Sequence, residues 1–267
     1  MKTAKERLTQ RMQELSHYTK KALGQNFLVS DQVIGKIITA VELEQPKKLL
    51  EIGPGLGALT DLLIEKFGQY QLIELDKSLV EFWRSQNMPV IEIDALKLDW
   101  STLSYDVLVS NLPYQISSSI VIDRSIDLKP CQSMILMFQK EVAQRIRALH
   151  KTDDYSILSV IAQEFWKIET VCDAGMRDFN PAPKVNSRVL KFRAKQSPIL
   201  NRYDYLKFIK MCFKQRRRIL KSNLDSVYHE SFNNWVTVQK LSDKVRAEEL
   251  SIEQLRDLYF SVKGKTE

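Results

Sequence analysis

The stretch KKLLEIGPGLGALTDLLIEKFG, residues 47–68, decides the fold. Residues 47–52 end in a short apolar run of the kind that forms a buried strand. The glycine-rich turn from Gly53 to Gly57 opens into a helical pattern that closes at Gly68. A buried strand, a glycine turn and a helix in this order predict the first half of a βαβ unit.

The segments on either side extend this unit into an α/β pattern. Upstream, residues 31–43 place apolar side chains on one helical face after a capping Ser30 or Asp31. Downstream, the sequence predicts strands at 70–75, 89–93, 105–110 and 132–139, helices at 76–86 and 140–150, and a late antiparallel strand at 185–193. Strands that alternate with helices predict a parallel sheet with helices on both faces.

The end of the chain has a different pattern. Gln196-Ser197-Pro198 has the composition of a linker, and every segment after it has a helical pattern. Residues 251–259 even begin with a capping box, in which Gln254 follows Ser251 by three positions. The sequence therefore predicts a Rossmann-like α/β domain at 1–196 and a small all-helical domain at 197–267.

The net charge of +7 is concentrated in one stretch. Residues 201–221 carry eight Lys or Arg and one Asp, so this stretch alone accounts for the whole net charge. We place Lys214 and Arg216–Arg218 on a helix that runs through this stretch. A localised basic surface is typical of a protein that binds a phosphate backbone, although a solvated helix face explains a lone arginine run equally well.

Other classes of protein fit the composition less well. No apolar run is long enough to cross a bilayer, and the first residues have no apolar segment of a secretory signal. Cys131, Cys172 and Cys212 are too widely spaced for a disulfide framework or a metal clip. We therefore expect a cytoplasmic protein with no membrane contact and no metal site.

Three consecutive strand ends each offer a group that could bind a ligand. The glycines from Gly53 onward let the backbone approach a ligand closely. Glu74 ends the next predicted strand and could accept both hydroxyls of a ribose, and Asp94 ends the third and could accept an adenine amine. Either carboxylate alone could be a helix cap. Together they predict a cofactor site at the carboxyl edge of the sheet, for either NAD or S-adenosylmethionine.

The motif Asn111-Leu112-Pro113-Tyr114, at the end of the fourth strand, points to a reaction. An exocyclic base amine is a poor nucleophile because its lone pair is delocalised into the ring. The Asn111 side-chain oxygen and the Leu112 carbonyl could accept its two N–H groups and free that lone pair. Pro113 stiffens the turn, and Tyr114 offers a face on which an extruded base can stack. The alternative is a simple proline turn, which the three upstream features make less attractive.

With these motifs the chain resembles the rRNA adenine dimethyltransferase family, in particular the small-subunit rRNA enzymes. The family also includes the macrolide-resistance rRNA methylases. The matching strings are GQNFL (24–28), EIGPG (51–55), IELD (73–76), DA (94–95), NLPY (111–114), QKEV (139–142), FNPAPKV (179–185) and QRR (215–217). One departure is Gln115, in NLPYQIS where the family usually has NLPYNIS.

The resemblance implies a Rossmann-like methyltransferase that uses S-adenosylmethionine. It implies that the cofactor is held by Asn26, Leu28, Gly53, Glu74, Asp94 and Asn111. It also implies that Phe179 flanks the target adenine opposite Tyr114, and that the substrate is a pair of adjacent adenines near the 3′ end of small-subunit rRNA. The expected product is N6,N6-dimethyladenine, with a role in ribosome biogenesis.

The expected partner is small-subunit rRNA or the pre-small ribosomal subunit, bound by a monomer. We expect Lys184, Lys214 and Arg216–Arg218 to contact the RNA. Two alternatives stay open from the sequence. One is a large-subunit rRNA methylase of the macrolide-resistance type, and the other is a non-catalytic assembly or transcription factor on the same fold.

Overall fold

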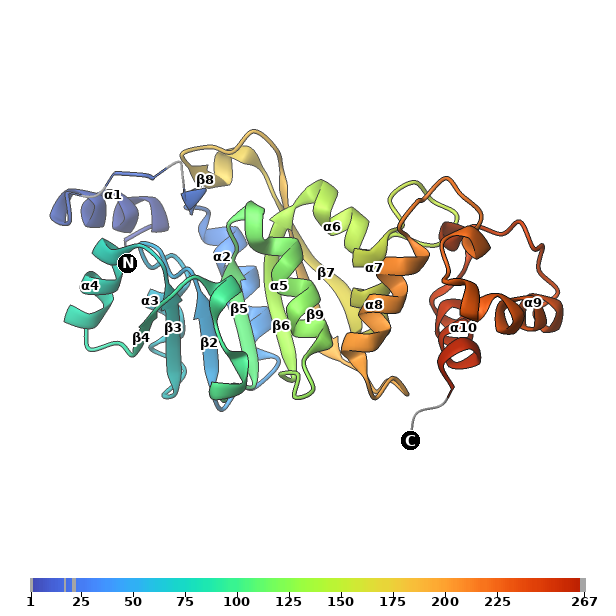
Figure 1. Ribbon diagram of the computed structural model, residues 1–267. Coiled ribbons are helices and arrows are strands. Elements are labelled where there is room, and N and C mark those ends of the chain that lie inside the picture. Colours follow the sequence, from blue (N-terminus) through green and yellow to red (C-terminus); the bar gives the residue numbers. More distant parts are fainter. Residues whose placement is uncertain (1, 17, 21–22, 265–267) are drawn as a thin grey trace. The chain divides into compact units, whose positions relative to one another are not determined.

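The computed structural model describes residues 2–16, 18–20 and 23–264, which form two units (Figure 1). The first unit contains the described residues up to Ile120, together with Cys131–Ala143 and Lys167–Ala194. The second contains Val121–Pro130, Gln144–Trp166 and the described residues from Lys195 onward. The second unit thus takes in two segments that precede the predicted boundary at residues 196 and 197.

The first unit is built on a seven-stranded sheet in the order β4-β3-β2-β5-β6-β9-β7. The strands are β2 (Leu49–Ile52), β3 (Tyr70–Glu74), β4 (Val90–Glu92), β5 (Val107–Asn111), β6 (Ser133–Gln139), β7 (Trp166–Ala174) and β9 (Ser187–Ala194). The pairs from β4 to β6 are parallel, and β9 is antiparallel to β6. The predicted α/β class and the late antiparallel strand are confirmed, whereas nothing in the sequence had suggested β7.

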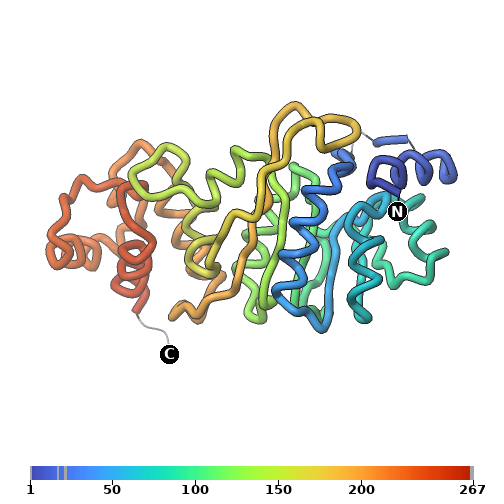
Figure 2. Tube along the Cα trace, turned by 180° about the vertical axis from the view of Figure 1, so that it is seen from behind, coloured from blue at the N-terminus to red at the C-terminus, as the bar shows by residue number. Residues whose placement is uncertain are grey.

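Helices cover both faces of this sheet. They are α2 (Asp31–Glu42), α3 (Thr60–Leu63) and α4 (Lys77–Ser85), with α5 (Tyr114–Ile126) and α6 (Lys140–Ile146) continuing into the second unit. The helix α1 (Ala4–Glu14) lies beyond the carboxyl ends of the strands. The helix α5 lies in front of β5 and β6 in Figure 1, and α2 lies in front of the sheet when it is seen from behind in Figure 2. The sheet edge that carries the strand ends therefore stays open between two helical layers.

The helix predicted over most of residues 53–68 is wrong in extent. Only Thr60–Leu63 are α-helical, and turns occupy much of the remainder. Gly53, Gly55 and Gly57 have φ values of 67°, 55° and 84°, which an α-helix cannot contain. The glycines thus delay the helix and leave a loop of exposed backbone at the end of β2.

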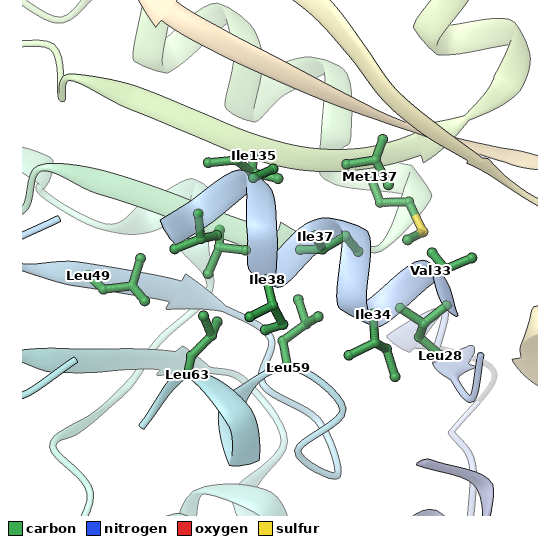
Figure 3. Close-up of a cluster of buried hydrophobic side chains, with 14 of the residues drawn as sticks. Leu28, Val33, Ile34, Ile37, Ile38, Leu49, Leu59, Leu63, Ile135 and Met137 are labelled. Atoms are coloured by element: carbon green, nitrogen blue, oxygen red, sulfur yellow. The ribbon is translucent and has the colours of Figure 1, made fainter. Parts of the chain in front are cut away.

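The core of the first unit centres on α2. Ser30 caps this helix by accepting a hydrogen bond from the Val33 backbone, and the predicted helix at 31–43 is confirmed within a residue. Figure 3 shows Ile38 pointing toward Leu59 and Leu63. The inner face of the helix is almost completely buried, as in Val33, Ile34, Ile37 and Ile38. Burying each such side chain stabilises the fold by about 1.5–3 kcal/mol.

A second, two-stranded sheet pairs distant motifs of the first unit. The strand β1 (Phe27–Leu28) is antiparallel to β8 (Phe179–Asn180), with Leu28 opposite Phe179. This pairing attaches the GQNFL motif to the FNPAPKV motif, which lies about 150 residues away in the sequence. Both segments are thereby held beside the carboxyl edge of the main sheet.

The second unit is helical apart from Trp166 of β7. Its elements are α7 (Ile157–Phe165), α8 (Arg202–Cys212), α9 (His229–Val238) and α10 (Ile252–Lys263), with the ends of α5 and α6 and short 3-10 turns. Tyr259 of α10 packs edge-on against Tyr205 and Phe208 of α8. The predicted capping box of Ser251 and Gln254 is confirmed at the start of α10.

All three cysteines of the chain are buried free thiols. Cys131 and Cys172 lie in the first unit, and Cys212 lies in the second. Burial raises the pKa of the Cys172 and Cys212 thiols above the ordinary value. Such thiols pack as small apolar side chains.

A buried carboxyl group joins β2, β3 and α3. The Glu51 side chain on β2 accepts a hydrogen bond of 2.7 Å from the Thr60 hydroxyl and another from the Tyr70 hydroxyl on β3. Only 2% of Glu51 is exposed. Burial raises the pKa of Glu51 to about 7, because the hydrogen bonds from Tyr70 and Thr60 offset only part of the desolvation.

This pKa makes the stability of the first unit depend on pH. Below the ordinary glutamate pKa of 4.5 both states are protonated, whereas between that value and about 7 only the unfolded chain releases the proton. Stability should therefore fall by about 3 kcal/mol as pH rises through this window. The Glu51→Gln variant should lose this dependence, as measured by urea unfolding at about pH 4 and about pH 8. The exposed Glu65→Gln variant should show the same pH dependence as the unmodified chain. An equal change in unfolding free energy between the two pH values in all three proteins would contradict the assignment.

Candidate functional site

A cavity of about 210 Å³ opens at the carboxyl ends of β2, β3, β4 and β5. It lies entirely within the first unit. The predicted residues that line it are Asn26, Leu28, Gly53, Glu74, Asp94, Asn111, Leu112, Pro113 and Tyr114. The structure therefore brings together every predicted cofactor residue and every predicted catalytic residue except Phe179.

The glycine turn forms the floor of the cavity at the end of β2. An added side chain at Gly53 would meet no atom within 4 Å, so its backbone faces open space. At Gly55 an added Cβ would lie 3.0 Å from the Phe27 ring. The turn therefore presents bare backbone to a ligand on one side and packs tightly against β1 on the other.

Glu74 is held in place by three backbone groups. Its carboxylate accepts hydrogen bonds from the Leu75 and Asp76 N–H groups at 2.8 and 2.9 Å, and from Gly55 at 3.3 Å. Burial raises the pKa of Glu74 from its ordinary value, against these hydrogen bonds. A fixed acceptor in an almost dry position suits a ligand with paired hydroxyl groups.

Asp94 follows β4 and has a structural role as well. Its Oδ1 accepts a 2.9 Å hydrogen bond from the Leu96 backbone and so caps the 3-10 turn at Ala95–Lys97. The cap interpretation considered for the sequence is thus correct for this oxygen. The carboxylate also lines the cavity, and capping by one oxygen leaves the second as an acceptor.

Asn111 is the last residue of β5, and its side-chain amide is oriented by the residue that precedes β1. The Asn111 Nδ2 donates a 3.2 Å hydrogen bond to the Asn26 carbonyl. Because the nitrogen is used in this way, Oδ1 is the group that Asn111 can offer to a substrate amine. Leu112 is buried and Tyr114 begins α5, so the motif turns sharply from strand into helix at the cavity wall.

Tyr114 is held by a residue that the sequence did not single out. Its hydroxyl lies 2.8 Å from the Ser187 Oγ on β9, and Ser187 is fully buried. Burial raises the pKa of Tyr114 above its ordinary value, so the ring is neutral. A serine at the start of a strand carries no signal of such a role, because its partner is 73 residues away.

The helix α1 closes one side of the cavity, which the sequence also did not suggest. Ala4, Arg7 and Leu8 line the cavity. Arg11 donates to the Leu56 carbonyl at 2.8 Å and to Asp61 at 2.9 Å. The basic residues of the first segment are thus used partly to fasten α1 to the loop after β2.

Phe179 lies away from the cavity lining. It is 4% exposed, belongs to β8, and packs in the hydrophobic cluster that includes Leu28 and Val33. The cavity lining does not include it. Its expected contact with the target adenine stays a prediction, and it would require access to a ring that is now packed in the core.

The predicted RNA-contacting residues lie in both units. Lys184 is exposed between β8 and β9, and Lys214, Arg217 and Arg218 are exposed after α8. The prediction that one helix carries the basic run through residue 221 is wrong, because α8 ends at Cys212. The Asn223 Nδ2 donates to the Cys212 and Gln215 carbonyls at 2.8 and 3.1 Å, which satisfies the helix end and holds the turn.

Arg216 differs from its two neighbours. It forms an ion pair with Glu248 and donates a 3.2 Å hydrogen bond to the Thr152 carbonyl. Among the described residues, none of the ion pairs includes Arg217 or Arg218. Glu248 lies in the 3-10 turn Ala247–Glu249, a few residues before α10.

The described residues contain neither a metal-binding cluster nor a membrane-spanning helix. No group of three or more His, Cys, Asp or Glu side chains could hold a metal ion there. No helix in the described part of the chain is long and apolar enough to cross a membrane.

The chain is similar to proteins of established name. It is 50% identical to the ribosomal RNA small subunit methyltransferase A of Bdellovibrio bacteriovorus, with 97% of this chain and 98% of the relative covered. A protein of the same name from Sulfurihydrogenibium sp. is 37% identical, with 92% and 96% covered.

Solved structures and a family model agree with these relatives. A dimethyladenosine transferase from Plasmodium falciparum superposes with a TM-score of 0.75 at 26% identity, covering 90% of this chain and 98% of that one. The 23S rRNA methyltransferase ErmE has a TM-score of 0.67 at 24% identity, covering 89% and 100%, and shares the fold. The model of the family "Ribosomal RNA adenine dimethylase" matches residues 16–263. The chain therefore belongs to the ribosomal RNA adenine dimethylase family.

Proposed function

We propose that this chain transfers methyl groups from S-adenosylmethionine to N6 of two adjacent adenines near the 3′ end of small-subunit rRNA. As a member of its family the chain is an rRNA adenine dimethyltransferase, and small-subunit rRNA is its substrate. The observation that carries the detailed proposal is the convergence of Glu74, Asp94 and Asn111 on one cavity. The product is N6,N6-dimethyladenine, made during ribosome biogenesis.

The two alternatives are not favoured. The relatives at 50% and 37% identity are both named small subunit methyltransferases, whereas the likeness to the 23S enzyme extends to the fold alone. A non-catalytic assembly factor would have no need for an Asn111 amide oriented by a backbone carbonyl. A role in assembly alongside catalysis is compatible with the proposal.

The cavity fits S-adenosylmethionine. The open backbone at Gly53 leaves room for the methionine part of the cofactor, and Glu74 would accept the two ribose hydroxyls. Asp94 would accept the adenine amine, and Asn26 and Leu28 would border the cofactor on the β1 side. The bound cofactor supplies a methyl group on a positively charged sulfur, which is a strong electrophile.

The catalytic part of the cavity would act by alignment. The Asn111 Oδ1 and the Leu112 carbonyl would accept the two N–H groups of the target amine and localise its lone pair on N6. N6 would accept the methyl group that the bound cofactor supplies, and the surplus proton of N6 would pass to water. Tyr114, fixed by Ser187, would stack on the extruded base. Phe179 would flank the base on its other side after local opening.

The RNA would be held by exposed cations outside the cavity. We assign this role to Lys184 in the first unit and to Lys214, Arg217 and Arg218 in the second. Arg216 would contribute less, because Glu248 already neutralises it. We propose that residues 197–267 act as an RNA-contacting helical domain.

Two further features complete the proposal. The chain would act as a monomer in the cytoplasm. The buried free thiols Cys131, Cys172 and Cys212 support a reducing compartment.

The first test concerns the cofactor. Glu74→Ala should weaken S-adenosylmethionine binding by about 1–3 kcal/mol, because the ribose hydroxyls lose a charged acceptor. Calorimetric titration measures this directly. The matched control is Glu92→Ala, an exposed carboxylate opposite Glu74 on the neighbouring strand that does not line the cavity. Equal affinities in folded Glu74→Ala and the control would remove Glu74 from the site.

The second test concerns catalysis. Asn111→Ala should lower kcat far more than it lowers RNA affinity, since the lost acceptor acts on the reacting nitrogen. Methyl incorporation into an rRNA fragment and binding of the same fragment are measured in parallel. Normal kcat combined with a large loss of RNA affinity would show that Asn111 serves binding.

The third test separates the three arginines. Arg217→Ala with Arg218→Ala should reduce the slope of log affinity against log salt by up to about two units, since each phosphate contact contributes about 0.7–0.9. Arg216→Ala should change the slope less and lower the melting temperature, because the Glu248 and Thr152 contacts are lost. Cofactor affinity serves as the internal control. An unchanged slope in the double variant would exclude these arginines from the RNA contact.

A further inference from the structure

Asp76 is a buried carboxylate just outside the cavity with several hydrogen-bond partners. It stands at the N-cap of α4, and its side chain is 0% exposed. Its Oδ1 accepts a 3.2 Å hydrogen bond from the Ser78 backbone and 2.8 Å from the Ser78 hydroxyl. Capping needs only the first of these acceptor contacts, which an asparagine side chain makes equally well. The other partners of Asp76 therefore call for a different explanation.

Those partners lie in the lead-in segment, which we define as Lys20 and Leu23–Asn26. The Lys20 Nζ lies 2.6 Å from the Asp76 Oδ1, and the Gln25 Nε2 donates to Oδ2 at 2.9 Å. The Lys20 backbone N–H also donates to the Gln25 side chain at 2.8 Å. One buried carboxylate thus fixes both ends of a segment that makes no sheet ladder before Phe27.

Asp76 also contacts the residue assigned to the cofactor ribose. Its backbone N–H donates a 2.9 Å hydrogen bond to the Glu74 Oε1. The orientation of the Glu74 carboxylate and the position of the lead-in segment are therefore both set at the turn between β3 and α4.

The lead-in segment in turn reaches the methyl-transfer end of the cavity. Gln25 is followed by Asn26, whose carbonyl accepts the 3.2 Å hydrogen bond from the Asn111 Nδ2. The Asn26 side chain is turned back onto the Gly24 carbonyl at 3.2 Å. A shift of Gln25 would therefore move the carbonyl that decides which atom Asn111 presents to a substrate.

The ionised form of Asp76 suits this arrangement. Burial alone would raise the pKa of Asp76, but hydrogen bonds from Lys20, Ser78 and Gln25 outweigh burial and hold the pKa below its ordinary value. A charged acceptor binds its donors about twice as strongly as a neutral one. The lead-in segment is thus fastened to α4 by charge-assisted hydrogen bonds.

We propose that Asp76 is a positioning residue for methyl transfer, which acts through Gln25 and the Asn26 carbonyl to orient the Asn111 amide. The same residue links the ribose end of the cavity to its catalytic end, because its backbone N–H donates a hydrogen bond to Glu74 and its side chain accepts one from Gln25. This inference rests on the proposed roles of Glu74 and Asn111.

The test compares Asp76→Asn and Gln25→Ala with the control Glu81→Gln, which makes the same change of carboxylate to amide at an exposed position of α4. Asp76→Asn preserves the volume and the helix cap but removes the charge that Lys20 and Gln25 share. Gln25→Ala leaves the cap untouched. Single-turnover methyl transfer to an rRNA fragment is measured with cofactor and RNA both saturating, because Gln25 itself borders the cavity.

Both test variants should transfer methyl groups about 10-fold more slowly or worse, a range expected for misplaced reacting groups. RNA affinity should change little, and the Glu81→Gln rate should match that of the unmodified chain. The double variant Asp76→Asn with Gln25→Ala should be hardly slower than either single one, because both remove the same link.

Several outcomes would overturn the inference. Unchanged rates in folded Asp76→Asn and Gln25→Ala would do so, as would rate losses that multiply in the double variant. If Asp76→Asn does not fold, Gln25→Ala alone decides, since it leaves α4 intact. An unmodified chain that transfers no methyl group to the fragment would count against the proposed function instead.

Discussion

The parallel register of β2, β3, β4 and β5 is the constraint on which the site depends. Ile52 lies opposite Ile73, Glu74 opposite Glu92, and Glu51 opposite Val109. With this register the four strands end at one edge, so the glycine turn, Glu74, Asp94 and Asn111 meet without any of them being close in sequence. Parallel strands must be covered on both faces, and α2 and α5 supply that cover while leaving the edge free. A slip of one residue in the pairing of β3 would turn Glu74 away from the cavity and move the buried side chains of the strand to the wrong face of the sheet.

The remaining sides of the cavity are held by a different kind of force. The sheet edge rests on backbone ladders and buried apolar area, whereas α1 and the lead-in segment are fastened by a few side-chain hydrogen bonds and ion pairs. Arg11 attaches α1 to the Leu56 carbonyl and Asp61, and Asp76 attaches Lys20 and Gln25. Such bonds each add modest net stability but fix the direction of the groups that they join. The strand ends are therefore the rigid part of the site, whereas the positions of α1 and the lead-in segment depend on a few side-chain contacts.

The sequence predicted the carboxyl ends of the strands well, because hydrophobic periodicity and the positions of glycines are local signals. Strand limits at β2, β3 and β5 were within a residue or two, and the groups at their ends were found where expected. The helix after the glycine turn is shorter than predicted, because the positive φ values of the three glycines delay its start and turns follow Leu63. Helical periodicity also predicts a helix through the basic run. The structure has a turn there, held by Asn223 from further along the chain.

What the sequence could not give depends on contacts across long separations. Ser187 beside Tyr114, Arg11 beside Asp61, and Glu248 beside Arg216 are single polar residues with ordinary neighbours. Each becomes informative only when its partner is known. The grouping of Val121–Pro130 and Gln144–Trp166 with the C-terminal residues is similar, since no change of composition marks those limits. Phe179 is the opposite case, a residue with a clear motif signal: it is expected to flank the target adenine, but it is packed in the core.

The three native cysteines offer a practical opening for spectroscopy. Thiol reagents attack the thiolate, and burial both hinders access and keeps the Cys172 and Cys212 thiols protonated. The unmodified chain therefore provides a background of low reactivity for site-specific labelling. A single cysteine introduced at an exposed position such as Tyr18, which is 82% exposed and close in sequence to the lead-in segment, would take up a fluorophore selectively. Its emission could then report on cofactor and RNA binding in real time, without rebuilding the interior of the protein.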